Sequence, residues 1–191
     1  MKKRLLAALM AGAMALSMTA CGGSSSGSDD SNAASGSDSA KAGSYKVGVV
    51  QLVQHVALDA ATQGFKDALV EKLGEGNVKF DEQNASGDSA NCATIVNGFV
   101  SNGVDLILAN ATAPLQAAAQ ATADIPVLGT SVTEYGVALG LTDFDGVVGG
   151  NISGTSDLAP LDQQADMIVE WMPEAKKVGL LYCSAEATSQ Y

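Results

Sequence analysis

Basic side chains are scarce in this 191-residue sequence, which has 10 Lys and Arg against 21 Asp and Glu. The formal net charge of −11 repels the phosphate backbone of nucleic acids at long range, so a duplex nucleic-acid binder is not expected. A domain takes about 100–200 residues, which leaves room for one domain and part of a second.

Histidine and cysteine are also rare, with one His and three Cys. No cysteine spacing resembles a metal site, and the motifs GxGxxG, GxxxxGK[ST], HExxH and GxSxG are absent. His55 has no partner at a catalytic spacing, so a loop residue that donates a hydrogen bond near a helix start is favoured over a general base. We expect no enzyme activity, no cofactor and no metal.

The N-terminus is typical of an exported lipoprotein. Three basic residues precede an uncharged apolar run over 5–20, which is shorter than the ~20 residues of a spanning helix. The run ends in Met18-Thr19-Ala20-Cys21, which resembles the bacterial lipobox. We expect a lipoprotein signal peptide over 1–20 and lipidation, including palmitate, at Cys21, which anchors the protein to the outer face of the cell membrane. A soluble secreted protein is the alternative.

Residues 21–44 form a tether by composition. Of residues 22–44, 14 are Gly or Ser, and none is Leu, Ile, Val or Phe. Such a segment buries too little apolar surface to offset its chain entropy, so we expect it to be disordered.

Strand and helix patterns alternate after the tether. Short β-branched or apolar runs over 45–53, 77–80, 104–109 and 125–129 predict strands, and apolar residues at helical spacing over 58–73, 92–100 and 114–122 predict helices. This order predicts an α/β fold with a parallel, Rossmann-like sheet covered by helices. Ligands in such sheets bind beyond the carboxyl ends of the strands, where polar segments occur over 51–55, 110–112 and 130–133.

The second part of the chain holds fewer elements. A Gly-rich stretch of irregular or short extended structure over 136–154 precedes a helix near 161–172, a strand over 177–182 and a helix start over 184–189. We assign residues 45–153 to a first lobe and residues 154–191 to the start of a second, incomplete lobe. The chain is therefore expected to be part of a longer protein.

Two helix starts are candidate parts of a binding site. Thr112 is a candidate N-cap with Pro114 in the first turn, and the Ser184–Ser189 start would face it if the two lobes face each other. Helix starts favour an anion such as a carboxylate. Asp157 is either the partner of a ligand ammonium or the cap of the following helix, and the cap is favoured.

Cys92 and Cys183 remain if Cys21 is lipidated. A disulfide is conceivable in an exported protein, but the two lie in different lobes, so buried unpaired thiols are favoured.

The sequence from 45 to 191 resembles the ABC-transporter substrate-binding proteins of the TrpX type. The resemblance is carried by many short matches in order, which include VGVVQLV with His55, ALDA, QGF, QNASGD, DLILA, DIPV, SVT, NISGTSDL and VGLLY with Ser184 and Glu186. Val56 and Glu134-Tyr135 depart from the Pro and Asp-Pro that are common in the family.

The resemblance implies a two-lobed, type I periplasmic-binding fold that binds a small solute, in several members an aromatic amino acid such as tryptophan, for delivery to an ABC permease. It also implies a ligand cleft between the lobes, closed by a hinge near 151–157. The cleft residues it implies are Gln51, Thr112, Thr130, Ser131, Ser156, Asp157, Ser184, Glu186 and Ser189.

Three alternatives stay open on the sequence. The first is a sugar or other small-metabolite receptor of the same fold, the second is an enzyme on a flavodoxin-like α/β sheet, and the third is an inactive lipid-anchored fragment. Ligand identity and oligomeric state are not encoded in any motif of the chain.

Overall fold

The computed structural model describes residues 44–190. The expected signal peptide, Cys21 and almost all of the expected tether lie outside the described residues. Among the described residues, no helix has both the length and the apolar character needed to cross a membrane.

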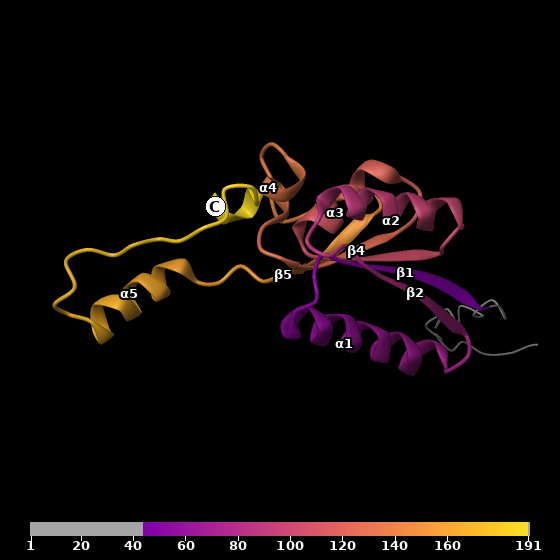
Figure 1. Cartoon of the computed structure of the whole chain (residues 1–191), viewed down its shortest axis with the longest axis horizontal. Coiled ribbons are helices and arrows are strands. Elements are labelled where there is room, and N and C mark those ends of the chain that lie inside the picture. The colour runs from indigo at the N-terminus through magenta and orange to yellow at the C-terminus, as the bar shows by residue number, and fades with distance from the viewer. Residues whose placement is uncertain (1–43, 191) are drawn as a thin grey trace, which may run out of the picture. The chain divides into compact units, whose positions relative to one another are not determined.

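A five-stranded parallel sheet organises the chain (Figure 1). The strand order is β2-β1-β3-β4-β5, with every neighbouring pair parallel. The strands are β1 (Tyr45–Gln51), β2 (Val78–Asn84), β3 (Leu106–Asn110), β4 (Val127–Val132) and β5 (Ile152–Ser156). The helices are α1 (Val56–Leu73), α2 (Ser89–Ser101), α3 (Thr112–Ala121), α4 (Tyr135–Leu139), α5 (Leu161–Trp171) and the 3₁₀ turn η1 (Ala187–Gln190).

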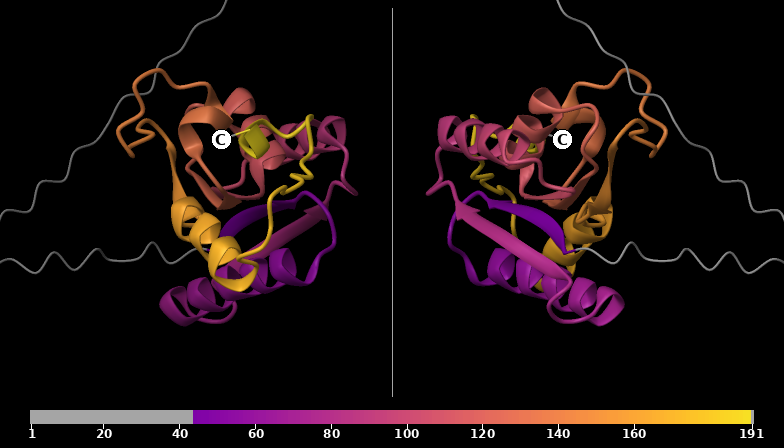
Figure 2. Two further views of the ribbon diagram at one scale, coloured as in Figure 1. Left: turned by 90° about the vertical axis from the view of Figure 1, so that its left-hand side faces the viewer. Right: turned by 90° about the vertical axis from the view of Figure 1, so that its right-hand side faces the viewer.

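Helices cover the two faces of the sheet unequally. α1 lies on one face, and α2 and α3 lie on the other, in all views (Figure 2). Successive side chains of β1 point to opposite faces of the sheet and so contribute to two core clusters. Val49 packs with Phe65 and Leu69 of α1, whereas Val50 packs in the larger cluster with Phe99. The α/β, parallel-sheet expectation is confirmed.

Side-chain caps fix the starts of the first two helices. The Asp88 carboxylate accepts a hydrogen bond from the Ala90 N–H at 2.8 Å, at the start of α2. His55 does the same for α1, because its Nδ1 accepts from the Ala57 N–H at 3.2 Å. The histidine thus acts at a helix start, as an acceptor and not as the expected donor.

Three expectations for secondary structure in the second part of the chain need correction. The stretch 136–154, expected to be irregular or short extended structure, also contains most of the helix α4, while its extended part is the beginning of β5. The strand expected over 177–182 is absent, because no strand within residues 44–190 lies beside it to share hydrogen bonds. The helix expected from Ser184 is a turn followed by η1.

The cysteines are unpaired within the described residues, as expected. Cys92 is buried in α2, and burial raises the pKa of its thiol. Cys183 is exposed, contrary to the expected burial, because the strand that would have buried it does not form.

Tyr135 joins β4 to β5 through two glycines. Its phenol donates to the Thr155 carbonyl oxygen at 3.1 Å, and it fills the space that a Cβ at Gly129 or Gly154 would need. Burial raises the pKa of Tyr135 to about 12, because the phenolate form would lose its hydration there. The Tyr135 side chain thus packs directly on the backbone of the two glycines and stabilises the pairing of β5 with β4 at the edge of the sheet.

We expect Gly154→Ala to lower the free energy of unfolding by about 1–3 kcal/mol. The added Cβ would overlap the Tyr135 hydroxyl and the Gly129 carbonyl oxygen. The matched control is Gly64→Ala in α1, where nothing lies within 4 Å of the new Cβ. It should raise stability by about 0.5–1 kcal/mol, since Ala favours a helix interior over Gly. Urea unfolding of both variants checks the pair, and equal effects would contradict this account.

Candidate functional site

The carboxyl ends of the strands bring a row of polar residues to one edge of the sheet. Gln51 lies opposite Asn84 on one side and Asn110 on the other, and Asn110 lies opposite Thr130. The parallel register therefore places four polar side chains from distant parts of the chain in one line, at the edge where α/β proteins bind ligands.

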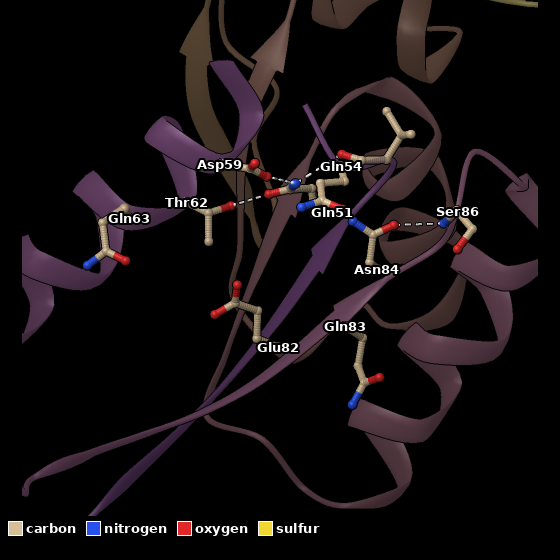
Figure 3. Close-up of a pocket in the computed structure, with 10 residues that line it drawn as sticks. Gln51, Gln54, Asp59, Thr62, Gln63, Glu82, Gln83, Asn84 and Ser86 are labelled. Carbon is tan, nitrogen blue, oxygen red and sulfur yellow. Dashed lines mark hydrogen bonds between the residues drawn. The ribbon is translucent and has the colours of Figure 1, made fainter. Parts of the chain in front are cut away.

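A buried network ties this row to α1 (Figure 3). The Gln51 Oε1 accepts from the Thr62 hydroxyl at 2.8 Å, and the Gln51 Nε2 donates to the Asp59 carboxylate at 2.6 Å. The Asn110 Nδ2 donates to Thr62 Oγ1 at 2.9 Å and to the Leu58 carbonyl oxygen at 2.8 Å. Gln51 is only 5% exposed, so its amide orients α1 against the sheet.

The other amide oxygen of the network has no protein partner. Asn110 Oδ1 is fully buried and lacks a hydrogen bond, and it is the one such side-chain atom among the described residues. A buried unpaired acceptor costs about 1–3 kcal/mol. The two hydrogen bonds donated by Asn110 Nδ2, to Thr62 and to the Leu58 carbonyl oxygen, offset that cost at the junction of β3 and α1.

An open pocket of about 820 Å³ lies between α1 and the end of β2 (Figure 3). Its wall is polar, with two carboxylates, Asp59 and Glu82, and no basic residue in its lining. Glu82 is paired with Lys66 at 2.6 Å. The amides of Gln54 and Asn84 face the opening, which makes this a hydrogen-bonding surface.

The start of α3 has an unusual backbone. Ala111 precedes the helix with φ 105° and gives it no side-chain cap, so the expected capping role of Thr112 is not observed. Thr112 is instead the first residue of the helix and is 8% exposed. A non-glycine residue in this region of φ and ψ costs of order 1–3 kcal/mol, and such residues cluster at functional sites.

The C-terminal segment packs against α4 through η1. The Glu186 carboxylate accepts hydrogen bonds from the hydroxyl of Thr188 at 2.8 and 2.9 Å and from the hydroxyl of Ser189 at 3.1 Å. Burial raises the pKa of the Glu186 carboxyl, but hydrogen bonds lower its pKa by more, so the net shift is downward. The carboxylate form is therefore the one that accepts these hydrogen bonds.

The ends of β4 and β5 meet through short polar contacts. The Ser156 hydroxyl donates to the Thr133 carbonyl oxygen at 2.6 Å and accepts from the Leu158 N–H at 3.2 Å. The hydroxyls of Thr130 and Thr155 lie 3.4 Å apart. Ser131 has φ 55°, a left-handed conformation at the end of β4. Ser156 thus shapes the crossover that follows β5.

A cavity of about 450 Å³ lies beside this crossover. Asp157, Thr133, Thr188 and Ser189 supply its polar wall. Its apolar wall is lined by Leu158, Ala159, Leu161 and Leu180. A carboxylate, three hydroxyls and leucine side chains around one space suit a small amphipathic molecule that carries a positive charge.

The chain matches the family model described as ABC transporter substrate binding protein over residues 46–191. The chain belongs to this family. The family resemblance read from the sequence is thereby confirmed, and the described lobe is one lobe of a periplasmic-binding fold.

Relatives of known name or structure support the family assignment. A "Tyrosine-binding protein" of Clostridioides difficile strain R20291 is 39% identical over 190 residues, which cover 98% of this chain and 54% of the relative. A conserved domain protein of Vibrio cholerae superposes with a TM-score of 0.72 at 36% identity, covering 77% of this chain and 50% of that one. The ABC domain of Streptococcus pneumoniae in complex with L-Trp gives 0.71 at 37% identity, with the same coverage. The chain thus spans about half the length of these family members.

The expected site residues of this family member fall into separate groups. Glu186 and Ser189 are hydrogen-bonded to each other at η1, and Asp157 and Ser189 line the 450 Å³ cavity. Thr112 is buried at the start of α3. Thr130, Ser131 and Ser156 lie at the ends of β4 and β5. Gln51 belongs to the buried network instead, and Ser184 is exposed in the turn before η1.

Thr62 is the polar residue of the buried network that sequence reasoning missed. Asn110, Thr133 and Thr188 lie within the polar segments 110–112, 130–133 and 184–189 that the sequence indicated, although they were not singled out there. The sequence did offer a signal for Thr62, because it is a polar residue beside the apolar stripe of the helix predicted over 58–73. Among the described residues, no group of three or more His, Cys, Asp or Glu is placed to hold a metal ion.

We expect Thr62→Val to destabilise the fold by about 1–3 kcal/mol, because Gln51 and Asn110 lose a buried partner while the side-chain shape is kept. Thr94→Val is the matched control, since the Thr94 hydroxyl is exposed and bonds only within its own helix, to the Ala90 carbonyl oxygen. Urea unfolding of the two variants should separate them. An equal loss in both would mean that the network contributes nothing beyond β-branched helix propensity.

Proposed function

We propose that this chain belongs to an exported solute-binding lipoprotein that captures an aromatic amino acid between two lobes for an ABC permease. Residues 1–20 would direct export, lipidated Cys21 would anchor the protein outside the cell membrane, and residues 21–44 would tether it. The strands up to β5 would form the first lobe, and residues 157–191 would begin the second. No chemical reaction is proposed.

The observation that carries this proposal is the cavity of about 450 Å³ beside Asp157. Free amino acids offer an ammonium, a carboxylate and a side chain, and each has a counterpart near this cavity. Asp157 would pair with the ammonium, the hydroxyls of Thr133 and Ser189 would bind the carboxylate, and leucine side chains of the cavity wall would contact an aromatic ring. Thr112, at the start of α3, would approach the ligand from outside this cavity. The volume lies within the range of about 300–1,000 Å³ that is common for small-molecule sites.

The remaining expected residues would complete the cleft. Thr130, Ser131 and Ser156 would form its floor at the ends of β4 and β5, and Ser184, Glu186 and Ser189 would approach it from the second lobe. Two family relatives support an amino-acid ligand, because one is a "Tyrosine-binding protein" and the other is an ABC domain in complex with L-Trp. Closure of the lobes would sequester the solute and create the surface that the permease recognises.

A polyhydroxylated solute is the second candidate. The pocket beside α1 favours it, because amides and carboxylates without a lining aromatic ring are suited to hydroxyl groups. This candidate is a separate arm of the test below.

Thermal unfolding of the complete natural polypeptide without its leader tests the proposal. L-Tyrosine, L-tryptophan or L-phenylalanine should raise the melting temperature, because a ligand at one hundred times its Kd stabilises the native state by about 2.7 kcal/mol. Asp157→Asn should abolish most of the shift, whereas Asp166→Asn on exposed α5, which makes the same change of charge, should leave it intact. A rise in melting temperature with a sugar, and none with an amino acid, would contradict the amino-acid assignment and support a polyhydroxylated ligand.

A further inference from the structure

The pairing of β4 with β5 is interrupted just before Asp157, the proposed partner of the ligand ammonium. The register shifts between Gly129 and Val132, where β4 has two residues and β5 has only Thr155. Two residues against one is the arrangement of a β-bulge, and Ser131 within it has φ 55°. Thr155 of β5 therefore has no residue opposite it in β4.

The Tyr135 phenol supplies a contact at this gap. It donates to the Thr155 carbonyl oxygen at 3.1 Å, and Tyr135 is only 6% exposed. The ring belongs to the larger core cluster, so its packing gives the phenol oxygen a fixed place from which to bond the strand. The phenol thus holds the backbone of β5 at the residue where the register with β4 is broken.

Asp157 follows Thr155 by two residues and leads the chain away from the sheet. The Asp157 N–H donates to the Val132 carbonyl oxygen at 3.2 Å, and the Ser156 hydroxyl donates to the Thr133 carbonyl oxygen at 2.6 Å. The next helix, α5, has no buried residue. The direction of the Asp157 carboxylate therefore depends on how firmly the end of β5 is held, and the Tyr135 phenol is part of that hold.

We propose that Tyr135 is a positioning residue for ligand binding, whose phenol fixes the end of β5 so that the Asp157 carboxylate faces the ligand ammonium. This inference rests on the proposed function and adds to it a residue that does not line the 450 Å³ cavity. Tyr135 touches no ligand and acts through the backbone of Thr155. A carboxylate held in place binds an ammonium more tightly, because less freedom is lost on binding. The effect is confined to ligands that carry an ammonium.

Calorimetric titration of Tyr135→Phe tests the inference on the complete natural polypeptide without its leader. The variant keeps the ring that packs on Gly129 and Gly154 and removes only the hydroxyl that bonds Thr155. The Kd of L-tyrosine should rise by about fivefold to tenfold, the equivalent of one net hydrogen bond. Desaminotyrosine has the same ring and a carboxylate but no ammonium, so its Kd should stay unchanged.

Amide hydrogen exchange of the ligand-free protein gives a readout that a merely structural role would not produce. The Asp157 N–H bonds the Val132 carbonyl oxygen, on the far side of the gap. The Val127 N–H bonds the Asn151 carbonyl oxygen, at the other end of the same pair of strands. Tyr135→Phe should speed exchange at Asp157 more than at Val127, because the hydroxyl holds only the end of β5.

Tyr45→Phe is the matched control. It deletes a hydroxyl at the first residue of β1, at the edge of the sheet away from the site, and should change neither Kd nor either exchange rate. If desaminotyrosine binds too weakly to titrate, the exchange rates decide, and only a preferential acceleration at Asp157 supports the inference.

Other results would overturn the inference. Equal weakening of both ligands by Tyr135→Phe would mean that the phenol supports the whole cleft and does not act through Asp157. An unchanged Kd of L-tyrosine, or equal acceleration of exchange at Asp157 and Val127, would reduce the phenol to a structural hydrogen bond. Failure of the wild-type protein to bind any aromatic amino acid would end the proposed function and the inference together, and it would be seen before any substitution is made.

Discussion

Parallel pairing of β1 with β3 is the constraint on which the rest of the structure depends. It sets Gln51 opposite Asn110, and the two amides share Thr62 as a partner, so the central strands and α1 are fixed by one buried network. Pairing of β3 with β4 extends the same register to Thr130. The loops after β1, β3 and β4 begin at the ends of these strands, and their positions follow from that register.

Much of the first lobe could be predicted from the sequence because its signals are local. The apolar runs of β1 and β3 and the stripe of α1 lie where the periodicity placed them. β5 was predicted only as irregular or short extended structure, since its sequence ISGTS has one large apolar residue and four of its five residues are exposed. The strand expected over 177–182 was wrong for the opposite reason: VGLLY favours a strand, but a strand needs a neighbour to pair with.

The candidate site could be predicted only in part. Parallel topology gave the edge of the sheet and hence Thr112 and Asp157, but not which hydroxyl would meet which carboxylate. The packing of η1 against α4 is a tertiary contact between segments with no shared sequence pattern. The inward orientation of Gln51 could not be predicted either. A polar residue at a strand end gives the same sequence pattern whether its side chain faces a ligand or a buried threonine.

The packing of Tyr135 against Gly129 and Gly154 makes the tolerance of these two glycines unequal. The three atoms nearest to a Cβ at Gly129 all belong to the Tyr135 side chain, so a smaller residue at position 135 would relieve the closest contacts there. A side chain at Gly154 also meets the backbone of Gly129, which no change of side chain removes. Sequence drift at position 129 is therefore conditional on position 135, whereas position 154 stays glycine for as long as β4 and β5 remain paired.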